Sequence, residues 1–339
     1  METTSYVSFP VPTPLFDESV IADKPKRVFR RYRWLLALLT AAGIGVTSVL
    51  GIYAYAAWAL GNPVIAPLKS NPAEAIGVAY EDVLFPSADG SSEVSGWYLP
   101  AGTGGKTVVL SHGYGTNREE PWVPMYELAR QLHKQNFNVV MFDYGFTKPN
   151  RSVTGGIVET QELLGAVQYA KSRESGPLYV WGFSMGAGTA LQAALKTDLI
   201  DGMILDSTFI LDPDTMFHNI KQHLSLLPRT PSVSLINLFF PVFSGYSLNQ
   251  VPYQAVKTTT YDIPLFLIHG EQDTKAPYTS ITSFYSNQKA NPASQLWLVP
   301  DGHHELIFAE HRKEYLKRTL QFLDACVRQA EETGHRTAV

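Results

Sequence analysis

The chain has 339 residues, of which 45% are hydrophobic and 17% charged, which is typical of a folded globular protein and excludes a disordered chain. Its formal net charge is −4 and the body of the chain has no polybasic run, so a nucleic-acid partner has no electrostatic support. A single cysteine, Cys326, excludes an intramolecular disulfide, a cysteine-based metal site and a redox cysteine pair. We expect this side chain to pack within a C-terminal helix.

An uncharged apolar segment lies near the start of the chain. Residues 35–60 carry no charged side chain over 26 positions, which as a helix is long enough to cross about 30 Å of hydrocarbon. Basic residues gather in the preceding segment, 1–34, at Lys24, Lys26, Arg27, Arg30, Arg31 and Arg33. The next basic residue after the apolar segment is Lys69. The positive-inside rule therefore predicts a single-pass cell-membrane protein with its N-terminus in the cytoplasm and the rest of the chain outside it.

Two other structures are compatible with this segment. A buried core helix rarely runs so long without a charge, and the apolar run is too long for an ordinary signal peptide. Ala54-Tyr55-Ala56 nevertheless has the small-x-small form that signal peptidase accepts, so cleavage stays open. With or without cleavage, we expect the downstream chain to be delivered across the membrane, because no second apolar segment of comparable length follows.

The rest of the chain divides into a connection, a folded domain and a tail. Residues 61–76 contain three prolines and little periodicity, which indicates a short stalk. The folded domain is expected over 77–330, followed by a tail over 331–339. Within the domain, 78–85 and 93–98 have the pattern of two antiparallel strands.

Strand and helix patterns then alternate along the chain. We expect strands at 107–111, 138–143, 178–183, 202–206, 265–269 and 295–299. Helices are expected at about 120–135, 158–173, 185–197, 277–288 and 307–330. This alternation predicts an α/β protein with a mostly parallel sheet covered by helices on both faces.

Residues 210–262 interrupt the alternation. They hold five prolines and short helical patterns at a place where two sheet strands would otherwise follow closely. We expect a small helical cap over the C-terminal edge of the sheet. An ordinary helical excursion packed on the core is the alternative.

A candidate nucleophile lies in Gly182-Phe183-Ser184-Met185-Gly186. This Gly-x-Ser-x-Gly pattern follows a short apolar run and precedes a helical pattern, which is the setting of a nucleophile elbow. The turn is strained, so the positions beside the serine must be nearly free of side chain. The pattern alone is weak, but its strand-turn-helix setting is much rarer and favours Ser184 as a catalytic serine.

A serine hydroxyl needs a base, and the base needs an orienting acid, in the chain order Ser, Asp, His. Asp273 lies four residues beyond the predicted strand end at His269, where open α/β sheets place their chemistry. A helix-capping role is the plainer interpretation of this residue. Glu271 and Asp206 are lesser alternatives for the acid.

The base is expected in the loop Pro300-Asp301-Gly302-His303-His304-Glu305, again after a predicted strand. We prefer His304 because its spacing from Pro300 matches the loop usual at this point, and His303 is the alternative base. Three further histidines have the character of structural or surface residues, namely His112, His269 and His311. The sequence has no three histidines with metal-ligand spacing on one helix, so we expect no metal and no cofactor.

The anionic intermediate of acyl transfer needs hydrogen-bond donors, worth about 3 to 4 kcal/mol each. One candidate is the backbone N–H of Met185, directly after the nucleophile. The other is expected from the loop that follows an early strand, where Ser111-His112-Gly113-Tyr114-Gly115 suggests the N–H of Tyr114. A glycine turn that only joins strand to helix is the alternative.

These four ordered blocks resemble the α/β-hydrolase superfamily over residues 77–328, and more narrowly its serine aminopeptidase and monoacylglycerol-lipase-like branch. The resemblance implies an α/β-hydrolase fold with Ser184 as nucleophile, Asp273 as orienting acid, His304 as general base, and Tyr114 with Met185 as oxyanion donors. One loop departs from the pattern. Members commonly have an Asp-Tyr-Arg-Gly-x-Gly-like loop, whereas this chain has Asp143-Tyr144-Gly145-Phe146-Thr147 and no arginine, which puts the shape of that loop in doubt.

The sequence therefore predicts a membrane-anchored serine hydrolase with an extracytoplasmic catalytic domain and a small or lipid-like carboxylic ester as substrate. An aminopeptidase-like peptidase or a thioesterase is the alternative within the enzyme class. From another class, a non-catalytic, membrane-tethered binding module of the same fold is the alternative. The complete Ser, Asp and His set argues against that module.

Overall fold

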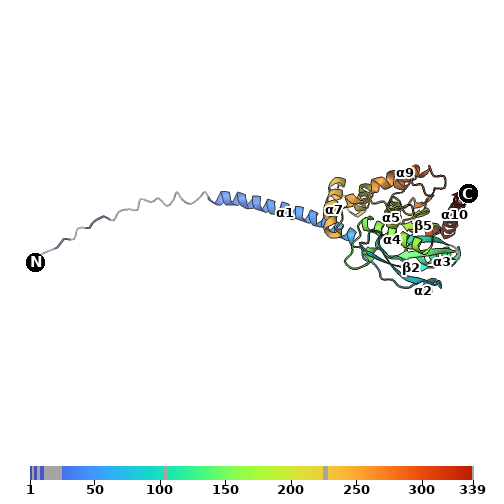
Figure 1. Ribbon diagram of the computed structural model, residues 1–339. Helices are drawn as coiled ribbons and strands as arrows, with labels where there is room; N and C mark the ends of the chain where they lie inside the picture. Colours follow the sequence, from blue (N-terminus) through green and yellow to red (C-terminus); the bar gives the residue numbers. More distant parts are fainter. Residues whose placement is uncertain (2–3, 6–7, 11–24, 103–104, 224–227, 338–339) are drawn as a thin grey trace. The chain divides into compact units, whose positions relative to one another are not determined.

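The computed structural model describes residues 1–339 except 2–3, 6–7, 11–24, 103–104, 224–227 and 338–339 (Figure 1). Part of the basic N-terminal segment, including Lys24, lies outside the described residues. The chain forms two compact units, residues 1–52 and residues 53–339.

A long helix, α1 (Pro25–Gly61), contains the apolar segment. Its part from Tyr32 to Gly61 is long and apolar enough to cross a membrane, and none of its most apolar window is buried. This exposure argues against a core helix, and α1 is a candidate membrane span. Its last turns, from Tyr53 on, belong to the second unit.

The second unit is built on a mixed sheet. In the described part of the chain, eight strands follow the order β1-β2-β4-β3-β5-β6-β7-β8. Their bounds are β1 (Glu81–Pro86), β2 (Glu93–Leu99), β3 (Lys106–Ser111), β4 (Phe137–Phe142), β5 (Leu178–Phe183), β6 (Gly202–Asp206), β7 (Leu265–Gly270) and β8 (Gln295–Val299). Strand β2 pairs antiparallel with β1 and β4, and all other neighbours are parallel. The predicted strands are confirmed within a few residues at each end.

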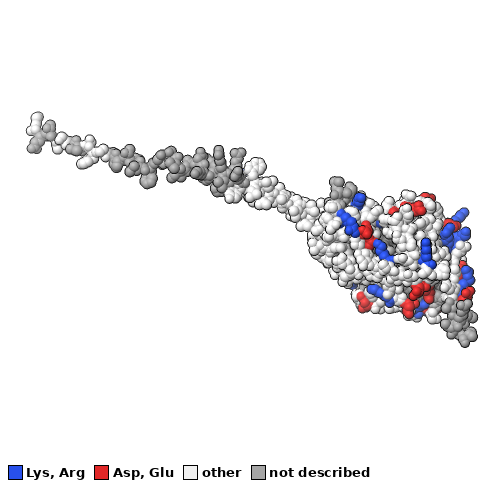
Figure 2. Space-filling model, turned by 90° about the horizontal axis from the view of Figure 1, so that it is seen from above, with Lys and Arg blue, Asp and Glu red and all other residues white. Residues whose placement is uncertain are grey.

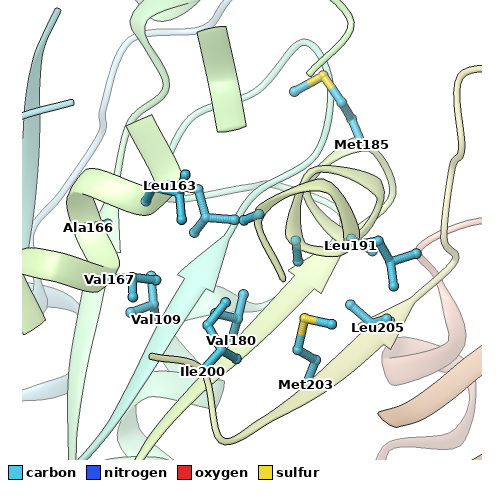
Figure 3. Close-up of a cluster of buried hydrophobic side chains, with 14 of the residues drawn as sticks. Val109, Leu163, Ala166, Val167, Val180, Met185, Leu191, Ile200, Met203 and Leu205 are labelled. Carbon is cyan, nitrogen blue, oxygen red and sulfur yellow. The ribbon is translucent and has the colours of Figure 1, made fainter. Parts of the chain in front are cut away.

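Helices cover both faces of this sheet (Figure 1). Side chains of α3 (Met125–Lys134) and α10 (Ile307–Thr337) share one buried cluster with the strands. Side chains of α4 (Ile157–Arg173), α5 (Met185–Ala194), α8 (Tyr253–Thr258) and α9 (Tyr278–Gln288) share the other. Figure 3 shows Leu163 and Val167 of α4 facing Val109 and Val180 of the strands. Because both faces are buried, the central strands are mostly apolar on both faces rather than alternating.

Two helices differ from the prediction in their limits. Helix α3 begins at Met125 instead of residue 120, because Pro121 and Pro124 disfavour helical backbone in the residues before them. Helix α10 continues to Thr337, through most of the segment expected to be a tail, and is kinked at His311.

Residues 210–262 form α6 (Pro213–His223), α7 (Arg229–Ser244), the 3₁₀ turn η3 (Leu248–Gln250) and α8. Met216, Ile236, Phe240 and Leu248 bury their side chains in a cluster separate from the two clusters on the sheet. Helices α6 and α7 thus have a buried cluster of their own, as expected for a cap, whereas Val256 of α8 packs in the main core.

Residues 61–76, expected to form a stalk, are bound to the domain surface and include a short helix, α2 (Pro72–Ile76). The side-chain amide of Asn117 donates to the carbonyl of Ala66 at 2.7 Å. The carboxylate of Glu119 accepts the backbone N–H groups of Lys69 and Ser70 at 2.6 and 2.8 Å. The connection from α1 to the sheet is therefore held in place rather than free.

The surface charges of this unit are mixed. Figure 2 shows Lys and Arg side chains interspersed with Asp and Glu side chains over the face in view, without a large patch of one sign.

Candidate active site

Ser184 lies in a sharp turn between β5 and α5. Its backbone has a φ of 49° and a ψ of −114°, a conformation that costs a non-glycine residue free energy. A side chain on Gly182 would lie 2.7 Å from the α-carbon of Ala187, and one on Gly186 would overlap the carbonyl oxygen of Ser111. Both glycines are therefore required for this close approach of backbone, as the elbow pattern predicts.

The structure brings His304 and Asp273 to this serine. Nε2 of His304 lies 2.9 Å from Oγ of Ser184, and Nδ1 of His304 lies 2.6 Å from Oδ2 of Asp273. The side chain of His304 is 6% exposed, and that of Asp273 is 0% exposed. Since a carboxylate only accepts, Nδ1 carries the proton and leaves Nε2 free to accept the serine proton.

Asp273 is held as an anion. Burial raises the pKa of its carboxyl, but the hydrogen bond from His304, the charge of that imidazole and the backbone N–H of Ala276 outweigh burial and leave the pKa below its ordinary value. Oδ1 accepts the N–H groups of Lys275 and Ala276, each at 2.8 Å. The loop after β7 thus folds around the carboxylate, which is more than a capping role requires.

The side chains of the alternative base and acid have other partners. The side chain of His303 is 56% exposed, and its Nδ1 lies 2.8 Å from Oε1 of Glu310. The carboxyl of Asp206 is buried and accepts the hydroxyls of Tyr315 and Ser207 at 2.7 and 2.9 Å. Burial raises the pKa of Asp206 to about 7, so the group is poorly suited to a permanent anion.

The remaining histidines have structural partners. His112 is buried and makes two hydrogen bonds to the backbone. Its Nε2 accepts the N–H of Tyr144 at 3.2 Å, and its Nδ1 donates to the carbonyl of Gly113 at 2.9 Å. Nε2 of His269 donates to the carbonyl of Ala276 at 2.7 Å, and burial lowers the pKa of this imidazole. In the part of the chain that the structure describes, no group of three His, Cys, Asp or Glu side chains is arranged to hold a metal ion.

The candidate oxyanion loop follows β3 and is fixed from two sides. The N–H of Gly113 donates to Oε2 of Glu120 at 2.7 Å. The hydroxyl of Tyr114 donates to the carbonyls of Ala59 and Leu60, at 3.1 and 3.0 Å. The loop is therefore bound both to the body of the domain and to the end of α1, with Met185 opening α5 beside the serine.

Two buried carboxyls near the site, Glu120 and Glu305, were not predicted from the sequence; they are 1% and 5% exposed. A side chain on Gly113 would meet the Oε1 atoms of both, and within the described chain neither Oε1 has a hydrogen-bond partner. Burial raises the pKa of each, and the charge of Glu305 raises that of Glu120 further. Oε2 of Glu305 lies 4.0 Å from Nε2 of His304, so the pair adjoins both the base and the oxyanion loop.

The loop over 143–147, which departs from the family pattern, is paired with an arginine from another loop. Asp143 accepts the guanidinium and the backbone N–H of Arg118, both at 2.8 Å, in a buried ion pair. The N–H of Gly145 donates to Glu162 at 2.8 Å, at the start of the 3₁₀ turn η2 (Gly145–Thr147). Arg118 comes from the loop after β3, so the motif itself held no signal for this pair.

Comparison with known proteins places this fold among the α/β hydrolases. A family model described as the alpha/beta hydrolase fold matches residues 106–233. The uncharacterized protein YfhR of Escherichia coli is 29% identical over 256 residues, which cover 72% of this chain and 80% of that protein. The lysophosphatidylserine lipase ABHD12 of Mus musculus is 25% identical over 209 residues, covering 58% of this chain and 48% of the lipase.

Solved structures with a similar fold include esterases. The Pyrococcus furiosus esterase Pf2001 is 27% identical with a TM-score of 0.62, and the match covers 78% of this chain and 99% of the esterase. Est1E from Butyrivibrio proteoclasticus, at 18% identity and a TM-score of 0.53, matches in fold over 72% of this chain and 100% of Est1E. The predicted α/β-hydrolase fold is confirmed.

Proposed function

We propose that this chain, which has the α/β-hydrolase fold, is a membrane-anchored serine hydrolase that cleaves carboxylic esters through an acyl-enzyme on Ser184. The observation that carries the proposal is the chain of contacts from Asp273 through His304 to Ser184, at 2.6 and 2.9 Å. A serine hydrolase needs this arrangement of acid, imidazole and hydroxyl.

The first half of the reaction forms the acyl-enzyme. His304 removes the proton from Oγ of Ser184 as the oxygen attacks the ester carbonyl carbon, and Asp273 stabilises the imidazolium. The N–H groups of Tyr114 and Met185 donate to the tetrahedral oxyanion. When the intermediate collapses, the bond to the alcohol oxygen breaks, and His304 returns its proton to that oxygen.

The second half releases the acid. A water molecule gives its proton to His304 and attacks the acyl carbon, and the bond to Oγ of Ser184 breaks as the serine recovers its proton. Both halves use the same three side chains, and neither needs a cofactor.

The relatives support an ester substrate. The Pyrococcus furiosus protein is named an esterase, and ABHD12 is named a lipase for a lysophospholipid, itself a carboxylic ester. A small or lipid-like ester is therefore the substrate class that we propose. Peptide and thioester cleavage are outcomes that the substrate test below distinguishes.

The proposed location follows from the charges around α1. Arg33 precedes the uncharged segment and Lys69 is the next basic residue after it, so the catalytic unit is assigned to the extracytoplasmic side of the membrane. A small ester or a membrane lipid on that side is the proposed partner.

Substrate preference and the choice of base are tested together with the purified full chain. We expect hydrolysis of p-nitrophenyl esters of graded chain length, and slower or no cleavage of aminoacyl-nitroanilides and acyl thioesters. His304→Ala should abolish turnover, whereas His303→Ala, its neighbour in the same loop, should retain it. Preferred cleavage of the anilides would contradict the ester assignment, and loss of turnover in His303→Ala alone would contradict the assignment of the base.

A further inference from the structure

The cap helix α7 is packed against the last turns of α1. Tyr53 and Ala57 of α1 are 2% and 0% exposed, in one buried cluster with Ile236 and Phe240 of α7. The hydroxyl of Tyr53 lies 2.8 Å from Oγ of Ser232. Helix α7 therefore lies level with the final turns of the candidate membrane span (Figure 1).

Those turns lie where a membrane span meets water. Starting from Leu35, about 20 helical residues cross the hydrocarbon, so the crossing ends close to Tyr55. Tyr55 and Trp58 are 68% and 44% exposed, and their amphipathic rings favour the headgroup region of a bilayer. This step rests on the proposed anchoring by α1.

The outer face of α7 is apolar and uncovered. Leu238 and Val242 are 63% and 73% exposed. No residue from Thr230 to Ser244 carries a charge. Leu238 and Val242 lie on the side of the helix opposite Ile236 and Phe240, since two positions correspond to about 200° of rotation. A helix that is apolar on both sides is stable when its outer side is also removed from water.

We propose that this outer face of α7, formed by Leu238 and Val242, lies in the bilayer, at the boundary between lipid headgroups and acyl chains. The occupant of the face is lipid, because the helix packed on its other side is the one that leads into the membrane. An uncharged helix lying in this interface buries its apolar side chains by several ångströms.

The placement has a consequence for the site. Tyr114, in the candidate oxyanion loop, donates its hydroxyl to the carbonyls of Ala59 and Leu60 in the same helix end. In this placement the candidate oxyanion loop lies within one side chain of the membrane surface, where an ester held in the bilayer would be presented.

Depth-dependent fluorescence quenching tests the proposal with the full chain in nanodiscs that hold one chain each. A bimane probe is attached to Val242→Cys in a Cys326→Ala background, and nitroxide-labelled phospholipid with its label near the headgroup serves as quencher. Ile52→Cys in α1 is the control for the anchor, and the exposed Ser283→Cys in α9 is the control for the distant surface. Each labelled variant must hydrolyse a soluble ester at the parent rate, which shows that it is folded.

We expect the probe at position 242 to be quenched at least half as strongly as the probe at 52, with little quenching at 283. Quenching at 52 with none at 242 would overturn the proposal and leave the anchor intact. Absence of quenching at both positions would overturn the anchor as well. A blue-shifted but unquenched probe at 242, seen only when two chains share a disc, would assign the face to a second copy and also overturn the proposal.

Discussion

Replacing Asp206 with Asn should remove the contribution of one buried carboxyl to the pH dependence of the free energy of unfolding. Asp206 ends β6, is 1% exposed, and accepts hydroxyls from Tyr315 and Ser207. Burial raises its pKa to about 7, against about 3.9 for an exposed aspartate. Asparagine keeps the size and most of the hydrogen-bonding capacity of the group but does not titrate.

The sign and size follow from proton linkage. Between pH 4 and 7 the folded state keeps a proton on Asp206 that the unfolded state has lost, so the free energy of unfolding falls as pH rises. Each pH unit between the two pKa values changes the free energy of unfolding by about 1.4 kcal/mol, and roughly two of these units lie between pH 5 and 8. From pH 5 to pH 8 the free energy of unfolding of the parent should therefore fall by about 3 kcal/mol relative to that of Asp206→Asn. This difference corresponds to roughly 6–12 °C in melting temperature.

Thermal unfolding of the full chain in detergent micelles, followed by tryptophan fluorescence at pH 5 and pH 8, measures this difference. Asp324→Asn, at an exposed position of α10, controls for the loss of a carboxylate from the surface. A melting-temperature difference between parent and Asp206→Asn that is the same at both pH values would refute the reasoning.

Three further predictions concern the same region. Asp273→Asn should lower kcat by about 10⁴-fold, because the imidazole loses its orienting anion; ester turnover by the folded variant within tenfold of the parent would contradict the role of Asp273. Glu120→Gln should keep the hydrogen bond from Gly113 and gain thermal stability relative to the parent as pH rises, because burial and the charge of Glu305 raise the pKa of Glu120; a constant difference between pH 5 and 8 would speak against it. Gly186→Ala should destabilise the domain by at least 1–3 kcal/mol, since its methyl group would overlap the carbonyl oxygen of Ser111; urea titration with an unchanged midpoint would show that the elbow tolerates a side chain.

The parts of the molecule that local sequence specifies were predicted best. Buried parallel strands such as β5 read as continuous apolar runs, and the elbow at Ser184 has its own glycine pattern, so both were recognised from short windows. The spacing of Asp273 and His304 from their strand ends was equally local. The contact of Asp273 with His304, and that of His304 with Ser184, agree with the proposed roles.

What escaped prediction depends on residues far apart in the chain. Glu120 and Glu305 meet at Gly113 across 185 positions, and a glutamate in a polar loop has no local signal for burial. The ion pair of Asp143 with Arg118 likewise joins residues of two different loops. The segment 61–76 read as a stalk because its prolines break periodicity, whereas its attachment relies on the side chains of Asn117 and Glu119.

The central claim is that Ser184 is an activated nucleophile, and covalent labelling by a fluorophosphonate tests it most directly. The folded full chain should react to one label per molecule, with the label located by peptide mass on Ser184, and Ser184→Ala should remain unlabelled. Failure of the folded parent to react, or equal labelling of Ser184→Ala, would contradict the claim.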